Sequence, residues 1–227
     1  MARKRGKELN TRLAILESAW QLFQQKGYEG TSVDAIVARA GLSKGTFFHY
    51  FPAKLSLLEA VCEHVVESAF SALSPQLEAP PLGARKRLNR LLAAMRTWRL
   101  AHAGTLVDLW RVLIRDENAA LRLKLTAVAD ACVKPLLVEI LARGNDEGVF
   151  SVEDVEQTAS LVLAMINSAG AENLSALAAG KAGDQIGLWL KRRSDIVATA
   201  IERVLGARPG TLDRVNLNSL SFPECDK

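Results

Sequence analysis

Cysteine is scarce in this chain of 227 residues. Cys62, Cys132 and Cys225 are its three cysteines, and no two of them have C-x-x-C spacing. An odd number of cysteines without that spacing argues against both a disulfide framework and a structural zinc site. The sequence therefore predicts a protein of a reducing compartment, the cytoplasm, whose fold depends on its apolar core.

Long apolar runs are also missing. The longest stretch without a charged residue, 157–171, covers 15 positions and includes Gln, Thr, Asn and Ser. A helix that spans a bilayer needs about 20 predominantly apolar residues. The basic N-terminus is not followed by the apolar core of a signal peptide. We therefore expect a soluble protein that makes no membrane contact.

Motifs for catalysis and cofactor binding are absent as well. The sequence has no Ser-His-Asp order, no H-E-x-x-H, no phosphate-binding P-loop and no dinucleotide glycine fingerprint. Glu63, His64 and Glu67 lie within one helical turn, but a metal centre needs more ligands than this, and a solvated helix surface explains them better. We predict no catalytic residue, no metal site and no cofactor.

Positive charge is concentrated near the N-terminus. Residues 1–54 hold nine Lys or Arg and four Asp or Glu, whereas residues 55–227 hold twenty and twenty-one. This asymmetry predicts that the first domain meets nucleic acid. Residues 1–12 are either a disordered solubilising tail or a basic arm that follows phosphates or enters a minor groove. The sequence leaves both readings open.

The stretch 31–54 carries two short helical patterns that meet at a turn. The first opens at Thr31 or Ser32, either of which can accept a hydrogen bond from a free N–H group of the helix. Gly41 fits the left-handed position past its end, and Ser43 can cap a second helix, from Lys44 to about Tyr50. A helix, a short turn with Gly and a second helix make a helix-turn-helix unit.

The second helix is unusual for a purely structural one. Gly45 near its start costs about 1 kcal/mol relative to Ala in a helix interior. A Gly is explained there if a phosphate or a base edge approaches the backbone closely. The helix also carries a polar face that Phe47 and Phe51 do not need for packing, formed by Lys44, Thr46, His49 and Tyr50. Taken alone, these residues are better explained by an ordinary helical hairpin with a solvated face, because helical hairpins are common.

The full string FQQKGYEGTSVDAIVARAGLSKGTFFHYFPAK resembles the DNA-binding signature of the TetR family of bacterial transcriptional regulators. The resemblance runs from Ala14 to about Val61 and includes GY-x-G-TS, A-x-AG-x-S-KGT and an aromatic-F-P-x-K exit. It implies an all-α fold, with an N-terminal three-helix helix-turn-helix domain and a larger C-terminal helical domain for ligand binding and dimerisation. It also implies residues that meet double-stranded DNA, namely Thr31, Ser32, Arg39, Ser43, Lys44, Gly45, Thr46, His49, Tyr50 and Lys54.

Two positions depart from the family pattern. Phe48 stands where the family usually has Tyr, whose hydroxyl reaches a phosphate, so that contact is lost. Leu55 stands where an acidic residue is common. We expect affinity to depend more on Lys44, Lys54 and the basic arm.

Apolar periodicity predicts helices throughout the chain. The first carries a stripe from Leu9 to Phe23, is capped by Asn10 or Thr11 and ends at Gly27. Further helices are expected at 54–72, 84–102, 106–113, 121–143, 152–179 and 184–205. We predict a DNA-binding domain over 1–54, an effector-binding and dimerisation domain over 55–208 and a loose tail over 209–227.

The helix at 152–179 is apolar on more than one side, so it must be covered on more than one side. It is either an unusually central helix of one domain or, as we prefer, half of a face formed with the helix at 184–205. That face predicts a homodimer, which would present two recognition helices to an inverted-repeat operator.

Met and Trp at helical spacing are more often core than a ligand pocket. Because members of the family commonly bind small effectors in this domain, the resemblance favours an apolar or aromatic effector held by Met95, Trp98, His102, Trp110, Cys132 and Asn167. His102 and Asn167 would be its polar anchors.

The sequence thus favours a DNA-binding regulator, a repressor released from a palindromic operator by a small molecule. The competing hypothesis is an all-helical binding protein or enzyme that keeps the helix-turn-helix as a scaffold, with His102 and Asp108 as candidate titrating groups.

Overall fold

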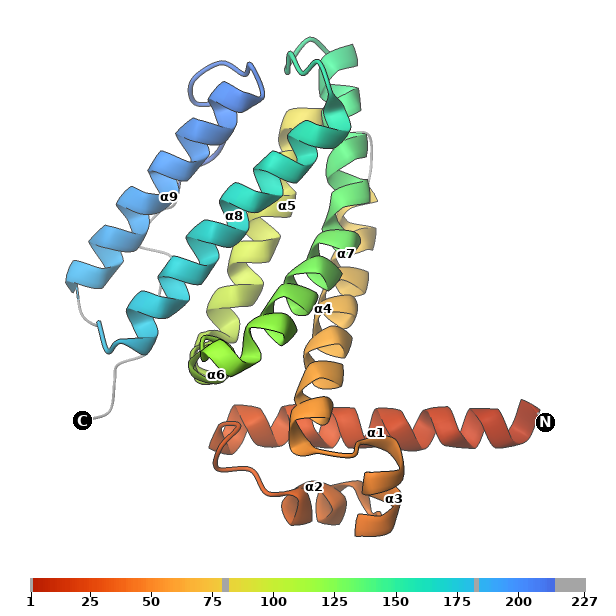
Figure 1. The fold of residues 1–227 in the computed structure, drawn as a ribbon. Helices are drawn as coiled ribbons and strands as arrows, with labels where there is room; N and C mark the ends of the chain where they lie inside the picture. Colours follow the sequence, from red (N-terminus) through yellow and green to blue (C-terminus); the bar gives the residue numbers. More distant parts are fainter. Residues whose placement is uncertain (1, 79–81, 182–183, 215–227) are drawn as a thin grey trace.

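The computed structural model describes residues 2–78, 82–181 and 184–214, with side chains described from residue 8 onward except at 72–78 and 184–185. All regular structure in these ranges is helical, which confirms the predicted class (Figure 1). The helices are α1 (Ala2–Lys26), α2 (Val33–Ala40), α3 (Lys44–Tyr50), α4 (Lys54–Glu78), α5 (Ala84–Ala101), α6 (Ala103–Leu113), the 3-10 turn η1 (Asp116–Asn118), α7 (Ala119–Asp146), α8 (Val155–Ala178) and α9 (Asp184–Val204).

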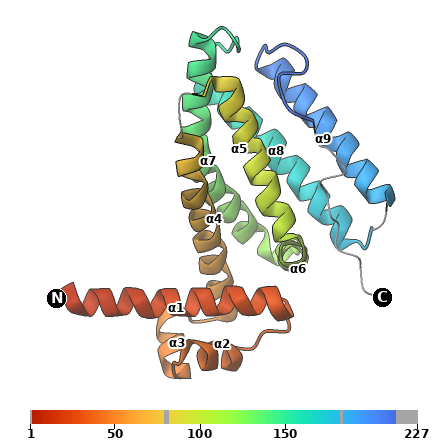
Figure 2. The same ribbon diagram turned by 180° about the vertical axis from the view of Figure 1, so that it is seen from behind.

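The small domain is built on α1, which lies across the base of α4 with α2 and α3 beneath it (Figures 1 and 2). Leu16 and Phe23 of α1 are almost fully buried, and they meet Ile36 of α2 and Phe47 of α3 in one apolar cluster. The first turns of α4 contribute Leu57, Leu58 and Val61 to the same cluster. The core of this domain therefore extends past residue 54 into α4.

Helix α1 begins at Ala2, not at the predicted Asn10 or Thr11. The early turns carry no apolar stripe, so periodicity could not reveal them, although their Lys, Arg and Glu residues are good helix formers. The backbone of the basic arm is thus helical here. The side chains of residues 1–7 lie outside the described part, and Arg12 rests 5.7 Å from the centroid of the Phe51 ring.

Helix α6 joins the two domains directly. Its Leu109 and Val112 are 4% and 3% exposed and belong to the apolar cluster of the small domain. At its C-terminal side, Arg115 Nη2 lies 3.2 Å from Glu29 Oε1, just after α1. Together with α4, which runs from one domain into the other (Figure 2), this packing gives the domains two connections.

The large domain packs α5, α7, α8 and α9 around a second apolar cluster. Leu88 and Leu91 of α5 meet Leu137 and Ile140 of α7 there, with Val162 and Leu163 of α8, Ile201 of α9 and Leu205 just after α9. Helix α7 passes through Pro135 without ending.

The start of α8 differs from the prediction. Asp154, not Ser151, caps the helix by accepting a hydrogen bond from Gln157 N at 2.9 Å. The preceding Val152 is held in the core by Asn145, whose side chain bonds both its N–H and its C=O. Tertiary packing of Val152 therefore moved the helix start by one turn.

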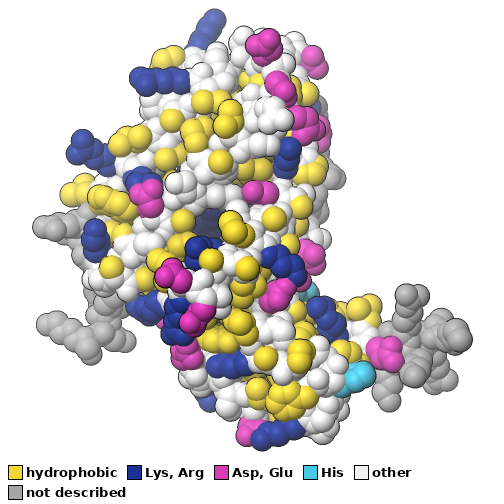
Figure 3. Space-filling model, in the orientation of Figure 1, with side chains coloured by type: hydrophobic (Ala, Val, Ile, Leu, Met, Phe, Trp, Pro, Cys, Tyr) yellow, Lys and Arg dark blue, Asp and Glu magenta, His cyan; other side chains and the backbone are white. Residues whose placement is uncertain are grey.

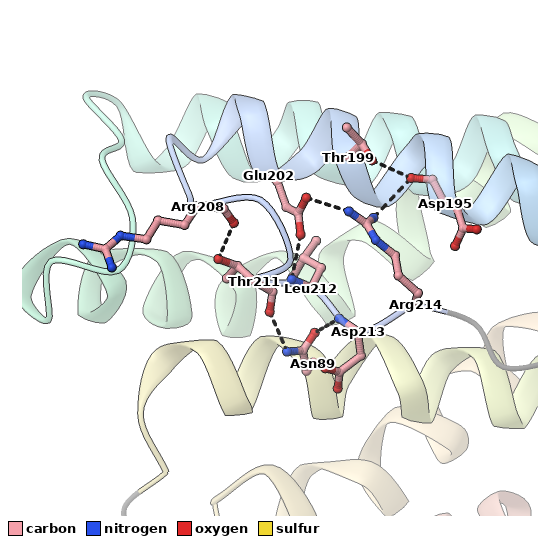
Figure 4. Close-up of polar contacts among 9 residues, drawn as sticks. All are labelled: Asn89, Asp195, Thr199, Glu202, Arg208, Thr211, Leu212, Asp213 and Arg214. Atoms are coloured by element: carbon pink, nitrogen blue, oxygen red, sulfur yellow. Dashed lines mark hydrogen bonds and ion pairs between the residues drawn. The ribbon is translucent and has the colours of Figure 1, made fainter.

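The segment after α9 is tied down by a group of polar contacts that we term the C-terminal clamp, formed by Asn89 and Glu202 with residues 211–214 (Figure 4). Asn89 Nδ2 donates to Thr211 O at 2.9 Å, and Asp213 N donates to Asn89 Oδ1 at 2.9 Å. Glu202, 3% exposed, accepts from Leu212 N at 2.8 Å and pairs with Arg214 at 2.7 Å.

The clamp corrects the prediction of a loose tail for residues 209–214, because Leu212 is 2% exposed and belongs to the core. No apolar period marks this short segment in the sequence, and its anchors Asn89 and Glu202 lie on other elements. The remainder of the predicted tail, 215–227, lies outside the described residues.

Candidate DNA interface and effector region

The helix-turn-helix joint is formed by local hydrogen bonds at the predicted residues. Ser32 Oγ accepts from Ala35 N at 3.2 Å and caps α2. Gly41 has φ 67°, in the left-handed region where a side chain would be strained, and its N–H donates to Ala38 O. Ser43 Oγ then accepts from Thr46 N at 3.1 Å and caps α3.

Helix α3 presents its polar residues outward. Lys44, Gly45 and His49 are exposed, and Thr46 is half-buried with its hydroxyl 2.9 Å from Ser43 Oγ. A Cβ added at Gly45 would meet only Ser43 Oγ, at 3.7 Å. The fold itself therefore has room for a side chain there, so packing does not explain the Gly.

Two cations beside α3 are held by surface partners. Lys44 Nζ lies 2.7 Å from Asp34 Oδ1, with both side chains largely exposed. Arg39 donates to Gln21 Oε1 at 3.2 Å and to Gln25 Oε1 at 2.8 Å on α1. Exposed pairs of this kind are weak, so both cations remain available to a polyanion.

Thr31 and Lys54 instead make contacts inside the small domain. Thr31 is 1% exposed, and its hydroxyl donates to Gly27 O at 2.7 Å. Lys54 Nζ donates to Tyr28 O at 2.5 Å and lies 4.1 Å from the centroid of the Tyr28 ring. Burial lowers the pKa of Lys54, and burial raises the pKa of Tyr28. These two residues have structural partners that the sequence pattern did not reveal.

Phe48 is an exposed aromatic on α3. It is 51% exposed, and its ring stands edge-on to Phe47 with centroids 5.2 Å apart. Phe47 alone of the pair fills the core, because neighbouring positions on a helix point in different directions. The Phe-Phe pair in the sequence was the signal that one aromatic would be left outside.

Two of the six predicted effector residues, Trp98 and His102, line a groove at the junction of the domains. The groove has a volume of about 290 Å³ and also involves α1 and α4. His102 stacks on Trp98 with ring centroids 4.6 Å apart, and its Nδ1–H donates to Trp98 O at 2.8 Å. The ring of Trp20 from α1 is tilted relative to the His102 ring, with centroids 5.8 Å apart.

Trp110 and Asn167 lie elsewhere, in polar contacts between helices of the large domain. Trp110 Nε1 donates to Ser175 Oγ at 2.9 Å, which joins α6 to α8. Asn167 Nδ2 donates to Asp130 Oδ1 at 2.8 Å, which joins α8 to α7. The predicted anchors His102 and Asn167 are therefore not brought together in one contact.

Met95 packs against the core of the large domain, and Cys132 is half-buried on α7. Burial raises the pKa of Cys132, and the nearby Glu67 of α4 raises it further. A residue that the sequence reasoning passed over, Arg99, points from α5 towards α8. A Cβ added at Gly170 would lie 3.8 Å from Arg99 Nη1. The sequence does contain a signal for this position, because Arg99 follows the apolar residues Leu91 and Met95 at intervals of four.

The acidic residues near His64 are engaged with a lysine. Glu59 and Glu63 of α4 both form ion pairs with Lys124 of α7. Within the described ranges, no group of three or more His, Cys, Asp and Glu side chains is arranged to hold a metal ion.

Helix α8 is the one described helix whose length and composition would allow it to cross a membrane, and 17% of its most apolar window is buried. Apolar side chains also stand out on this side of the molecule, with Leu161 of α8, Leu188 and Ile196 of α9 about 60% exposed. Figure 3 shows apolar side chains gathered over α8 and α9.

Comparison with known protein families matches residues 15–61 to bacterial regulatory proteins of the TetR family. An uncharacterized HTH-type transcriptional regulator YuxN from Bacillus subtilis is 36% identical over 80 residues, which cover 34% of this chain and 28% of YuxN. EthR of Mycolicibacterium smegmatis is 31% identical over 77 residues, 34% of this chain and 36% of EthR. The chain thus spans about a third of the length of these relatives.

Solved structures resemble the chain over most of its length. RolR in complex with resorcinol aligns with 98% of this chain and 100% of RolR, at 21% identity and a TM-score of 0.56. A regulator from Haloarcula marismortui aligns with 87% of this chain and 97% of its own, at 18% identity and a TM-score of 0.60. At these identities the likeness concerns the fold alone.

Proposed function

We propose that this chain, whose residues 15–61 match bacterial regulatory proteins of the TetR family, is a sequence-specific, DNA-binding transcriptional regulator of the cytoplasm, a repressor released by a small effector. The observation that carries the proposal is the helix-turn-helix joint. Ser32, Gly41 and Ser43 fix its geometry, and α3 turns a polar, largely exposed face to solvent.

The chemistry of that face supports DNA as the partner. Lys44 and Arg39 can contact phosphates, while Thr46, His49 and Tyr50 carry the hydrogen-bonding groups that read base edges in a major groove. Gly45 lets a phosphate or base come close to the backbone. Thr31 and Lys54 contribute by holding the small domain in shape, since both are engaged inside it.

The basic arm gives additional phosphate contacts. Its backbone continues α1 as a helix from Ala2, and Arg3, Lys4, Arg5 and Lys7 lie on it. Binding that rests on such contacts weakens steeply as salt rises.

The experiment is a mobility-shift assay with inverted repeats from the DNA upstream of the chain's own gene. A salt-sensitive shift that depends on sequence is expected. In the bound complex, Thr46→Ala and His49→Ala should change which operator variants are preferred, with about 1–3 kcal/mol for each lost base contact. Lys44→Ala should weaken all variants about equally and reduce the salt slope. Absence of any sequence-dependent shift would refute the proposal.

Pairing of α8 and α9 with a second copy of the chain completes the regulator. Leu188 and Ile196 line a groove of about 700 Å³ along α9, and Leu161 of α8 is also exposed. Helices that pair across a two-fold axis bury such a face in a four-helix bundle. The two copies of α3 must then lie about 34–36 Å apart to fill two half-sites.

The pairing is tested by Ile196→Glu, which puts a charge into the centre of that face. Light scattering of the native chain should give a dimer mass, and the variant should give a monomer with reduced operator affinity. Leu123→Glu is the control, because Leu123 is 70% exposed on α7, outside the proposed face. A variant that stays dimeric would contradict this interface.

Release by an effector requires that ligand binding move the small domain. Helix α4 places Leu57 and Val61 in the small-domain core and Phe70 against the large-domain core. A shift of α4 therefore changes the packing in both domains. Helix α6, through Leu109 and Val112, is a second connection. A ligand shifts the equilibrium only as far as it prefers the released state, and operator DNA must weaken ligand binding by the same factor.

An enzyme that keeps the helix-turn-helix as a scaffold is the other candidate. Its titrating groups would be His102 and Asp108. His102 is stacked on Trp98 with the tilted ring of Trp20 nearby, and Asp108 pairs with Arg111 at 2.7 Å. Turnover lost in His102→Ala, with no DNA binding in either protein, would favour this alternative.

A further inference from the structure

Arg99 is the feature of the large domain that neither packing nor charge pairing explains. It follows Leu91 and Met95 at four-residue steps on α5, so it lies on the side of the helix that faces the core. Its guanidinium approaches α8 where Gly170 has no side chain, since a Cβ there would be 3.8 Å from Nη1 and 3.9 Å from Cζ. A charged group therefore occupies the end of the apolar core.

No described residue forms a hydrogen bond or an ion pair with the Arg99 guanidinium. Two other inward-facing arginines of this domain are paired. Arg87 lies 2.6 Å from Glu139, and Arg193 lies 2.6 Å from Glu172. Solvent still reaches part of the Arg99 side chain, and burial lowers its pKa with no acidic neighbour to offset the effect. An unpaired buried cation is unfavourable unless something else pairs with it.

Asn173 of α8 holds a second polar atom without a partner. Asn173 follows Gly170 by three positions on α8, one turn along the same face, and its buried Oδ1 accepts no hydrogen bond. An amide can present either its oxygen or its NH₂ group in such a position. Arg99 is thus an unpaired donor that faces α8, whereas Asn173 Oδ1 is an unpaired acceptor on α8.

We propose that the effector is a carboxylate, and that Arg99 is the residue that binds it. The inference rests on the proposed function, because it names the chemical class of the ligand that acts on this regulator. A guanidinium offers two parallel N–H donors that match the two oxygens of a carboxylate. A carboxylate pairs with the cation that the protein leaves unpaired.

The surroundings indicate the rest of the ligand. Met95 precedes Arg99 by one turn of α5, and Trp110 is held to Ser175 on α8, two positions after Asn173. An apolar or aromatic body can pack against such side chains while its carboxylate meets Arg99. The ligand class is therefore an amphipathic monocarboxylate. It differs from the sequence-based expectation of an apolar or aromatic effector by its charged group.

The test compares carboxylates with the neutral amides of the same shape. Benzoate, phenylacetate and octanoate are each paired with benzamide, phenylacetamide and octanamide, and binding to the DNA-free protein is measured by Trp emission and by the thermal midpoint. At least one carboxylate should bind about 10- to 100-fold more tightly than its amide, the range of a charge-assisted hydrogen-bonded pair. Arg99→Lys should keep much of this preference.

Arg99→Met should abolish the preference and leave the thermal midpoint of the free protein equal or higher, since an unpaired cation is removed from the interior. Arg85→Met, an exposed arginine on the same helix, is the control for lost charge and should change neither property. The inference is overturned if no carboxylate binds better than its amide at millimolar concentration. It is also overturned if the preference persists in Arg99→Met.

The two proposals fail separately. An Arg99-dependent carboxylate preference in a chain that shifts no operator would retain the ligand site and refute the regulator. Operator binding without that preference would retain the regulator and refute the carboxylate.

Discussion

Replacing Gly45 by Ala separates what the fold needs at this position from what DNA binding needs. Gly45 is the second residue of α3, it is exposed, and an added Cβ meets only Ser43 Oγ at 3.7 Å. Ala is favoured over Gly in a helix by up to about 1 kcal/mol, less in the first turn. The variant should therefore unfold with a free energy about 0.4–1 kcal/mol higher than the native chain.

The same methyl group should weaken DNA binding. If a phosphate or base edge approaches the backbone at Gly45, the methyl group occupies that space, and relieving such overlap costs about 1–3 kcal/mol. We expect a loss of about 5- to 150-fold in operator affinity. Stability and affinity then change in opposite directions, which a merely destabilised variant cannot reproduce.

Urea unfolding of the free protein measures the first effect, and fluorescence anisotropy with a labelled operator duplex measures the second. Gly104→Ala is the matched control, because Gly104 is the second residue of α6 and an added Cβ there has no neighbour within 4 Å. It should stabilise the chain and leave DNA affinity unchanged. Native affinity in Gly45→Ala would refute the close approach of DNA to α3.

Three further predictions concern single contacts. Lys54→Met should lower the unfolding free energy by about 1–2 kcal/mol in urea, because the bond to Tyr28 O and the contact with its ring are lost; unchanged stability with a smaller salt slope of DNA binding would assign Lys54 to phosphate instead. Ser43→Ala should lower the free energy of unfolding by about 0.5–2 kcal/mol, because the side-chain cap of α3 is lost. An unchanged urea midpoint would contradict that role. Burial raises the pKa of Cys62 to about 12, so iodoacetamide at pH 8 should modify it about 1000-fold more slowly than a thiol of ordinary pKa, as peptide mapping would reveal; equal rates in native and denatured protein would exclude this protection.

The helix-turn-helix was predictable residue by residue because its signals are local. Ser32, Gly41 and Ser43 act on backbone groups two to four positions away, and each does what its residue type predicts. The helical class followed from apolar periodicity for the same reason. Where a boundary depended on a distant contact, as at Val152 with Asn145, the local signal placed it a turn too early.

The effector region was less predictable, since periodicity gives a face and does not give the neighbour that covers it. The sequence predicts Trp98 and His102 as pocket residues of the large domain. In the structure, Trp20 of α1 in the small domain packs beside them. No role is assigned to Arg99 from the sequence, because charged residues are mostly exposed. Its guanidinium lies near Gly170 of α8, 71 positions later, and no local pattern records that proximity.

The C-terminal clamp can form only late in the synthesis of the chain. Asn89 is bonded to Thr211 and Asp213, 122 and 124 positions later in the chain. A ribosome that adds about 5–20 residues per second needs roughly 6–25 s to make that interval. The core of the small domain is complete once Val112 of α6 has been made, whereas Leu205 and Leu212 reach the large-domain core only at the end. A nascent chain can therefore fold α3 well before the C-terminal clamp holds the end of α9. The surface proposed for pairing is complete only after residue 214 has been made.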